Sequence, residues 1–221
     1  MHNFYSNLIF VCATVIVAVI GLALLPPLVK AENNLISGNP SVLFQGVALG
    51  ELGRYGVDTA YFDRTLAIDP HLSHLPVLYN KGLALEELGN YTGAIRYYDM
   101  ALAIDPHDVK VLTSKGIALE ELGNYTGAIR YYDRALAIDP YDAAVLSNKG
   151  LSLDNLGYHA GAIQYYDRAL AIDPHNANTL SNKGNALHRL GNYNGAIQYY
   201  DRALAIDPHD ADTLQASNER S

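Results

Sequence analysis

The strongest constraint on this chain is an internal repeat with a period of 34 residues. The string Ala-Ile-Asp-Pro occurs five times, and the intervals between successive copies are 36, 34, 34 and 34 residues. A period of this length is typical of an array in which each small unit packs only against its neighbours. The copies end at Pro70, Pro106, Pro140, Pro174 and Pro208.

Each unit has the pattern of two helices joined by a turn, as the third copy illustrates. Small and apolar residues recur there at i, i+4 and i+7 in two separate stretches, which predicts two amphipathic helices. Gly123 stands between them and suits the left-handed residue that closes a helix. Asp139-Pro140 is expected to end the second helix, because the residue before proline is pushed out of the α region. The two stretches are Leu112, Gly116, Leu119 and Ala128, Tyr132, Ala135.

The pattern of these units resembles the tetratricopeptide repeat (TPR) family. The resemblance covers about residues 39–210, and it implies an all-α, right-handed superhelical solenoid of helix–turn–helix hairpins. It also implies a concave groove, lined by the first helix of each unit, that binds other polypeptides. The resemblance rests on Gly116, Tyr125, Ala128, Tyr132, Ala135 and Pro140, with their counterparts in the other copies.

A separate segment is expected before the repeats. Leu8 to Leu25 is an 18-residue stretch without a charge, and Val29-Lys30-Ala31 places small residues where a signal peptidase reads them. We expect a signal peptide or membrane anchor here, with the repeats outside the cytoplasm; an anchor with cytoplasmic repeats is the alternative. The expected organisation is this segment at 1–31, a linker at 32–38, five TPR units at 39–70, 75–108, 109–142, 143–176 and 177–210, and a C-terminal tail or short cap at 211–221.

Composition argues against several other functions. The formal net charge is −8, which disfavours nucleic acid, because its phosphates must be neutralised by Lys and Arg. Cys12 is the single cysteine, so cysteines can form neither a disulfide within the chain nor a zinc site. The sequence contains no Gly-rich phosphate loop, Ser–His elbow or metal signature. We therefore expect no enzyme activity, no cofactor and no bound metal.

Two aspartates recur in each unit and one lysine in each unit after the first, and we expect them to serve the repeat. A catalytic pair is a unique constellation, whereas a residue repeated in each unit is typical of structure. Asp139 and its counterparts stand before proline, where the side chain can accept backbone amides. Asp133 and its counterparts are expected to pair with the recurring lysines. These lysines are Lys81, Lys115, Lys149 and Lys183.

Function is expected at first-helix positions that the repeat does not demand. Acidic residues there predict recognition of basic groups in the middle of the groove, and asparagines offer hydrogen bonds to a peptide backbone. A merely solvated acidic face is the alternative. The predicted partner-binding residues are Asn80, Leu83, Glu86, Glu87, Ser114, Ile117, Glu120, Glu121, Asn148, Leu151, Asp154, Asn182, Asn185, His188 and Arg189.

The sequence thus predicts a scaffold whose partner is a protein or peptide with basic groups. Contact with a membrane is expected only through the N-terminal segment. The alternative is a structural protein of the cell envelope that self-assembles through its last repeat. That repeat is followed only by Ala211 to Ser221, in which Leu214 is the one large apolar residue.

Overall fold

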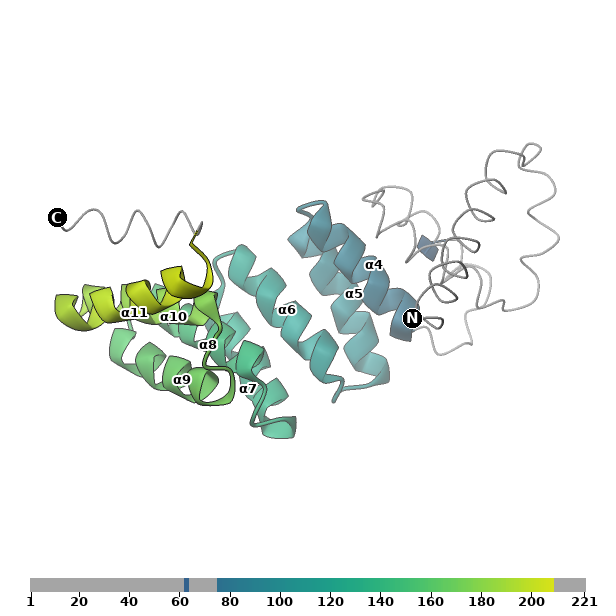
Figure 1. Ribbon diagram of the computed structural model, residues 1–221. Coiled ribbons are helices and arrows are strands. Elements are labelled where there is room, and N and C mark those ends of the chain that lie inside the picture. The colour runs from purple at the N-terminus through teal and green to yellow at the C-terminus, as the bar shows by residue number, and fades with distance from the viewer. Residues whose placement is uncertain (1–61, 64–74, 209–221) are drawn as a thin grey trace, which may run out of the picture.

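The computed structural model describes residues 62–63 and 75–208, and this part of the chain is all-α. Its helices follow one another as a row of antiparallel pairs (Figure 1). The first helices of the pairs are α4 (Leu75–Glu87), α6 (Val109–Glu121), α8 (Ala143–Asn155) and α10 (Ala177–Arg189). The second helices are α5 (Tyr91–Ile104), α7 (Tyr125–Ile138), α9 (His159–Ile172) and α11 (Tyr193–Ile206). The predicted solenoid of helix–turn–helix hairpins is confirmed.

A glycine in the left-handed conformation closes each first helix. Gly123 has φ 72°, and its N–H donates to the carbonyl of Glu120 at 2.8 Å. The N–H of Asn124 reaches back to the carbonyl of Leu119, also at 2.8 Å. This paired bonding satisfies the carbonyls left free at a helix end. The Asn124 side chain then caps α7 by accepting from the N–H of Gly127, so the turn between the helices is fully specified.

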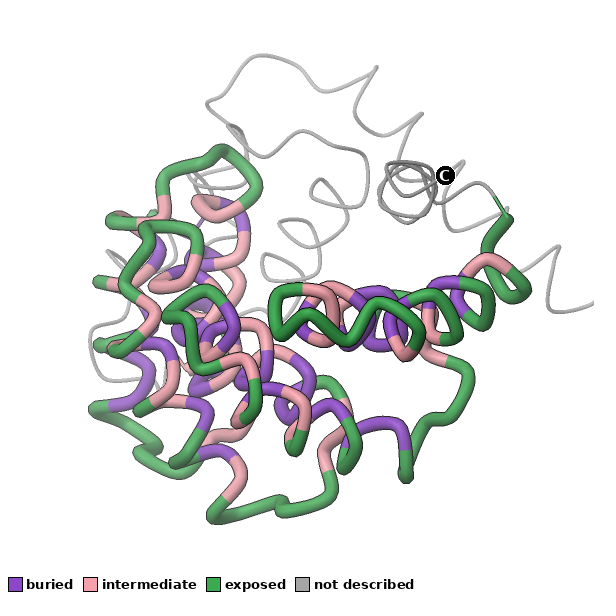
Figure 2. The backbone as a smooth tube through the Cα atoms, turned by 90° about the vertical axis from the view of Figure 1, so that its left-hand side faces the viewer, coloured by how far each residue is buried: buried purple, intermediate pink, exposed green. Residues whose placement is uncertain are grey.

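The two helices of a hairpin approach closely because glycine faces tyrosine between them. A Cβ built on Gly116 would lie 2.4 Å from Cε1 of Tyr132, far inside van der Waals contact. Tyr132 is fully buried, as are Ala128 and Ala135 on the same helix. Figure 2 shows the buried segments on the helix sides that face other helices, with the turns exposed. The core tyrosines of the four hairpins are Tyr98, Tyr132, Tyr166 and Tyr200.

A lysine joins each unit to the one before it. Lys115 is buried, forms an ion pair with Asp99 of the preceding unit, and lies with Nζ 4.2 Å from the ring centroid of Tyr131. It also donates to the Tyr131 hydroxyl at 2.6 Å. The predicted pairing of the recurring lysines with the recurring aspartates is thus confirmed. The pairs are Lys81–Asp63, Lys115–Asp99, Lys149–Asp133 and Lys183–Asp167.

Three of the aspartates that precede the recurring prolines do what the sequence predicts. Asp105 accepts from the N–H of His107 at 2.9 Å, and Asp139 accepts from that of Tyr141 at 3.1 Å. Asp173 accepts in the same way from His175 at 3.3 Å. These bonds order the loop that leads from one unit to the next.

Several expectations fall on residues that the structure does not describe. They are the N-terminal segment 1–31, the linker 32–38, most of the unit at 39–70, and the tail 211–221. Membrane insertion and localisation therefore stay predictions. Among the described helices, none combines the length and apolar character needed to cross a membrane.

Candidate partner-binding site

The first helices α4, α6, α8 and α10 form one continuous face, which we call the first-helix face. Each of the first three contacts the first helix of the next unit. Polar side chains link them across this face: the Ser147 and Thr179 hydroxyls are 2.8 Å apart, and Ser152 donates to Glu120 at 3.0 Å. The face is therefore built from neighbouring units together, and a ligand along it would contact several units at once.

Core tyrosines reach this face and hold two of its carboxylates. The Tyr98 hydroxyl donates to Glu86 at 2.6 Å, and the Tyr132 hydroxyl donates to Glu120 at 3.0 Å. Partial burial raises the pKa of both glutamates, and neighbouring carboxylates raise both pKa values further. Both carboxylates are thus fixed in position and incompletely solvated.

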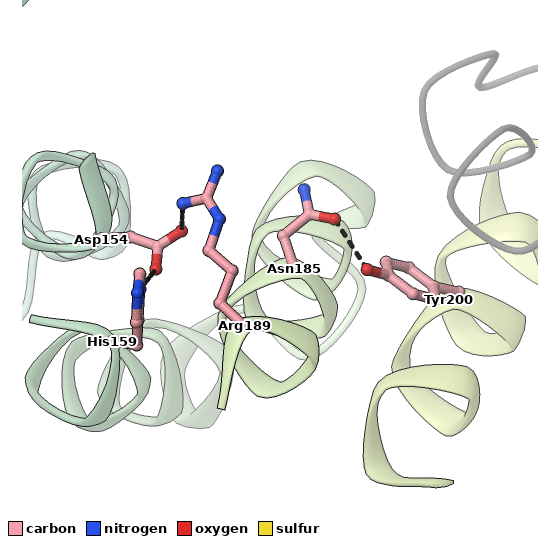
Figure 3. A network of polar contacts seen from close by, with 5 residues as sticks. All are labelled: Asp154, His159, Asn185, Arg189 and Tyr200. Atoms are coloured by element: carbon pink, nitrogen blue, oxygen red, sulfur yellow. Dashed lines mark hydrogen bonds and ion pairs between the residues drawn. The ribbon is translucent and has the colours of Figure 1, made fainter. Parts of the chain in front are cut away.

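Asp154 occupies the equivalent position in α8 but has different partners. It is only 3% exposed as a residue, and each of its oxygens has a partner at 2.5 Å: His159 Nδ1 on one and the guanidinium of Arg189 on the other (Figure 3). We expected Asp154 to receive a basic group from a partner, but Arg189 of this chain takes that place. The positive charge of Arg189, one of the predicted partner-binding residues, is directed to Asp154.

The last two core tyrosines do not repeat the tyrosine–acid bond. The Tyr200 hydroxyl donates to Asn185 at 2.7 Å (Figure 3). The buried Tyr166 hydroxyl has no hydrogen-bond partner among the described residues. Its counterpart acid is Asp154, whose side chain is one methylene shorter than Glu120 and is already engaged by His159 and Arg189. A change from Glu to Asp thus redirects the local network.

A hollow of about 310 Å³ opens where α4 and α6 end. In the described part of the chain, none of its carboxylates forms an ion pair with a Lys, Arg or His, and the same holds for Glu120 nearby. Glu121 lies near enough to raise the pKa of the Tyr91 phenol. We call this site the acidic hollow; it is lined by Glu86, Glu87, Gly89, Tyr91, Ile117 and Glu121.

The other predicted residues lie on the same first helices, with varied exposure. Ser114 is buried, and the Asn80 side chain donates to the carbonyl of Pro76 at 2.8 Å. His188 packs on Tyr193, with ring centroids 5.1 Å apart. The half-buried members are Asn80, Leu83, Ile117, Asn148, Leu151, Asn182, Asn185 and His188.

Sequence reasoning missed three contributors to this face: Tyr91, His159 and the hydroxyls of the core tyrosines. One signal for His159 was present, since it replaces the tyrosine found at that position in the other described units. The spacing of 35 residues between Asp154 and Arg189, one period plus one, was a second signal. Among the described residues, no cluster of three or more His, Cys, Asp or Glu could hold a metal ion.

Comparisons with known proteins agree with this architecture. Models of the tetratricopeptide repeat family match residues 60–109, 79–143, 113–177 and 177–210. No curated protein sequence matches the chain. YrrB, described as a TPR protein with an unusual peptide-binding site, is 23% identical; the match covers 86% of this chain and 96% of YrrB, with a TM-score of 0.68.

Two further solved structures are similar in the same way. MamA from Desulfovibrio magneticus RS-1 is 19% identical over 79% of this chain and 98% of its own, with a TM-score of 0.71. PilF from Pseudomonas aeruginosa is 21% identical over 82% of each chain, with a TM-score of 0.70. At these identities the similarity is one of fold.

Proposed function

Because this chain belongs to the tetratricopeptide repeat family, we propose that it is a non-catalytic scaffold that holds a segment of a partner protein along its first-helix face. The fold it shares with YrrB, a protein described by its peptide-binding site, supports this proposal. The partner segment we propose is extended or helical and carries basic groups.

The observation that carries the proposal is a division among the acidic residues. Aspartates on the second helices that face the next described unit each have a buried lysine as partner, as Asp133 has Lys149. Glutamates at the ends of α4 and α6 have no basic partner in the described structure, although Glu86 and Glu120 are partly buried. A partly buried carboxylate without a cation nearby costs free energy, so binding a cation of the partner there would be favourable.

Apolar and amide groups beside these acids suit a peptide. Leu83, Ile117 and Leu151 are half-buried, which leaves part of each side chain for contact. The half-buried Asn148 and Asn182 can both donate to and accept from a peptide backbone. A segment that follows α4, α6 and α8 would therefore meet charged, apolar and hydrogen-bonding groups in each unit.

The test is peptide binding by the full chain and by two variants with equal changes in charge. Glu86/Glu87/Glu121→Gln removes three charges from the acidic hollow. Each exposed ion pair is worth about 0.2–1 kcal/mol, so removing three charges should lower the affinity for cationic peptides by roughly 3- to 150-fold. The control Asp105/Asp139/Asp173→Asn removes three charges elsewhere and keeps an oxygen that accepts the loop amides.

Fluorescence anisotropy with decapeptides of net charge +3, 0 and −3 would give these affinities at low and moderate salt. Binding of the cationic peptide should weaken with salt, because the contacts are partly screened. The proposal would be refuted if Glu86/Glu87/Glu121→Gln bound the cationic peptide as tightly as the wild type does, or if the wild type preferred the anionic peptide. Either result would show that the acids of the first-helix face do not bind the partner.

Self-assembly stays a second candidate because of the outer side of α11. Ile197 is 41% exposed, whereas its counterparts Ile95, Ile129 and Ile163 are half-buried. Asp201 forms no ion pair with any described lysine, unlike its counterparts. Light scattering of the full chain over a hundredfold concentration range tests this candidate; a mass that stays monomeric rejects it.

A further inference from the structure

The acidic hollow has a filled counterpart elsewhere in the same molecule. Asp154 near the end of α8 meets Arg189, which is 35 residues further along the chain. The same step leads from Glu86 near the end of α4 to Glu121 near the end of α6. These two residues line one hollow, and Glu121 raises the pKa of the Glu86 carboxyl. The repeat thus places a second carboxylate where the last junction has a guanidinium.

The filled junction shows what fits such a place. The Arg189 side chain crosses from one unit to the preceding one and puts NH1 2.5 Å from an oxygen of Asp154. Its side chain remains 46% exposed, so a guanidinium reaches this position from the solvent side of the face. The repeat geometry therefore accommodates an arginine head group between consecutive first helices.

The junction between α6 and α8 is not a comparable site. Glu120 accepts hydrogen bonds there from the Tyr132 and Ser152 hydroxyls. The residue one period plus one after it is Asn155, which carries no charge. Of the three described junctions, only the one between α4 and α6 brings together carboxylates without a cation.

The walls of the acidic hollow favour arginine over lysine. A planar guanidinium can bond two carboxylates at once and can stack on an aromatic ring, whereas an ammonium is a compact and strongly hydrated charge. The hollow offers Glu86, Glu87 and Glu121 as acceptors, and Tyr91 and Ile117 as apolar surface. A guanidinium in the hollow could therefore contact the apolar surface and still pair its charge with a carboxylate.

We propose that the acidic hollow binds an arginine side chain of the partner, whose guanidinium would pair with Glu86 as that of Arg189 pairs with Asp154. This inference rests on the proposed scaffold function and names the residue that its partner must present. An arginine delivered from outside completes the junction between α4 and α6, as Arg189 completes that between α8 and α10. Partner binding and local packing of the array are thereby linked at one point.

The test uses variants of the full chain with a defined probe. The Glu121→Arg variant turns the first junction into a copy of the last, so that the chain supplies its own guanidinium to Glu86. The control Asp173→Arg has the same change in charge at the exposed end of α9, in a different unit from the hollow. The probes are acetyl-Leu-Arg-Leu-amide and its versions with lysine or citrulline at the centre, titrated by NMR.

We expect the wild type and the control to bind the arginine probe at least about fivefold more tightly than the citrulline probe, and more tightly than the lysine probe. The Glu121→Arg variant should lose this preference while its thermal midpoint is unchanged or higher. A preference that survives in that variant would place the guanidinium elsewhere and overturn the inference.

The two proposals fail in different ways. Equal binding of all three probes, abolished by Glu86/Glu87/Glu121→Gln, would overturn the arginine site and leave the first-helix face as a peptide site. Binding of neither the probes nor the decapeptides would overturn both.

Discussion

Replacing Gly116 by alanine should strongly destabilise the array, although alanine is the better helix former. The added Cβ would lie 2.4, 2.8 and 2.9 Å from Cε1, Cδ1 and Cζ of Tyr132. That ring is fully buried, so α6 and α7 must move apart or the tyrosine must leave its position. Overpacking of this kind costs about 1–3 kcal/mol, and alanine returns about 1 kcal/mol in helix propensity.

The clash has a second consequence on the first-helix face. A displaced Tyr132 no longer holds Glu120 with its hydroxyl, and a net hydrogen bond to a charged group is worth about 1.5–3 kcal/mol. We therefore expect the free energy of unfolding to fall by about 2–4 kcal/mol. Urea titration followed by circular dichroism at 222 nm measures this value. Because repeat arrays can unfold in parts, the transition should also be followed by tyrosine fluorescence.

Gly123→Ala is the matched control for this prediction. The same Cβ added at Gly123 meets no atom within 4 Å, and only the left-handed backbone, with φ 72°, opposes it. That conformation costs a non-glycine residue about 1–2 kcal/mol. If Gly116→Ala were as stable as the wild type, or more stable than Gly123→Ala, close approach of the two helices would not be what requires glycine at this position.

Three further predictions concern capping, titration and the junction between units. Tyr158 precedes α9 without a side-chain cap bond, so Tyr158→Asn should raise the free energy of unfolding by about 1 kcal/mol; an unchanged urea midpoint would contradict this. Burial raises the pKa of Glu120, so its ionisation destabilises the fold as pH rises above the ordinary value of 4.5. Glu120→Gln should therefore raise the thermal midpoint at pH 7 and lose this advantage near pH 4; a gain that does not depend on pH would refute the cause. Lys149→Met keeps the buried stem but loses the pair with Asp133, whose carboxylate is half exposed, so unfolding should cost less by only about 1 kcal/mol; a loss above about 3 kcal/mol would show that the pair is effectively buried.

The fold of the described units followed from sequence because the relevant signals are local and recur. Gly123 predicts its own turn, since few other residues adopt a positive φ without strain. The Lys149–Asp133 pair could also be predicted from the sequence. Lysines and aspartates that each recur at one position per unit have few other partners that would neutralise their charge. Repetition turned each weak local signal into a strong one.

The arrangement of the first-helix face could be predicted only in part. Periodicity assigns Asp154 and Glu120 to one column, but it does not say which residue of the next unit each carboxylate meets. That contact depends on side-chain length and on the rotation between units, and it differs between Glu120, bonded by Ser152, and Asp154, bonded by Arg189. Burial of Asp154 therefore became visible only in three dimensions.

The ion pairs between a lysine of one unit and an aspartate of the unit before it give the array a direction and make its units interchangeable. Each described unit from the second to the fourth presents an aspartate toward the unit after it, and each described hairpin presents a lysine toward the unit before it. Any such unit can therefore follow any other without altering the contact that joins them. Deleting or inserting 34 residues between α4 and α11 would preserve the Lys–Asp pairs between units. It would change the number of units between the acidic hollow and the Asp154–Arg189 pair. Gene duplication could in this way adjust the spacing of recognition points without rebuilding the scaffold that carries them.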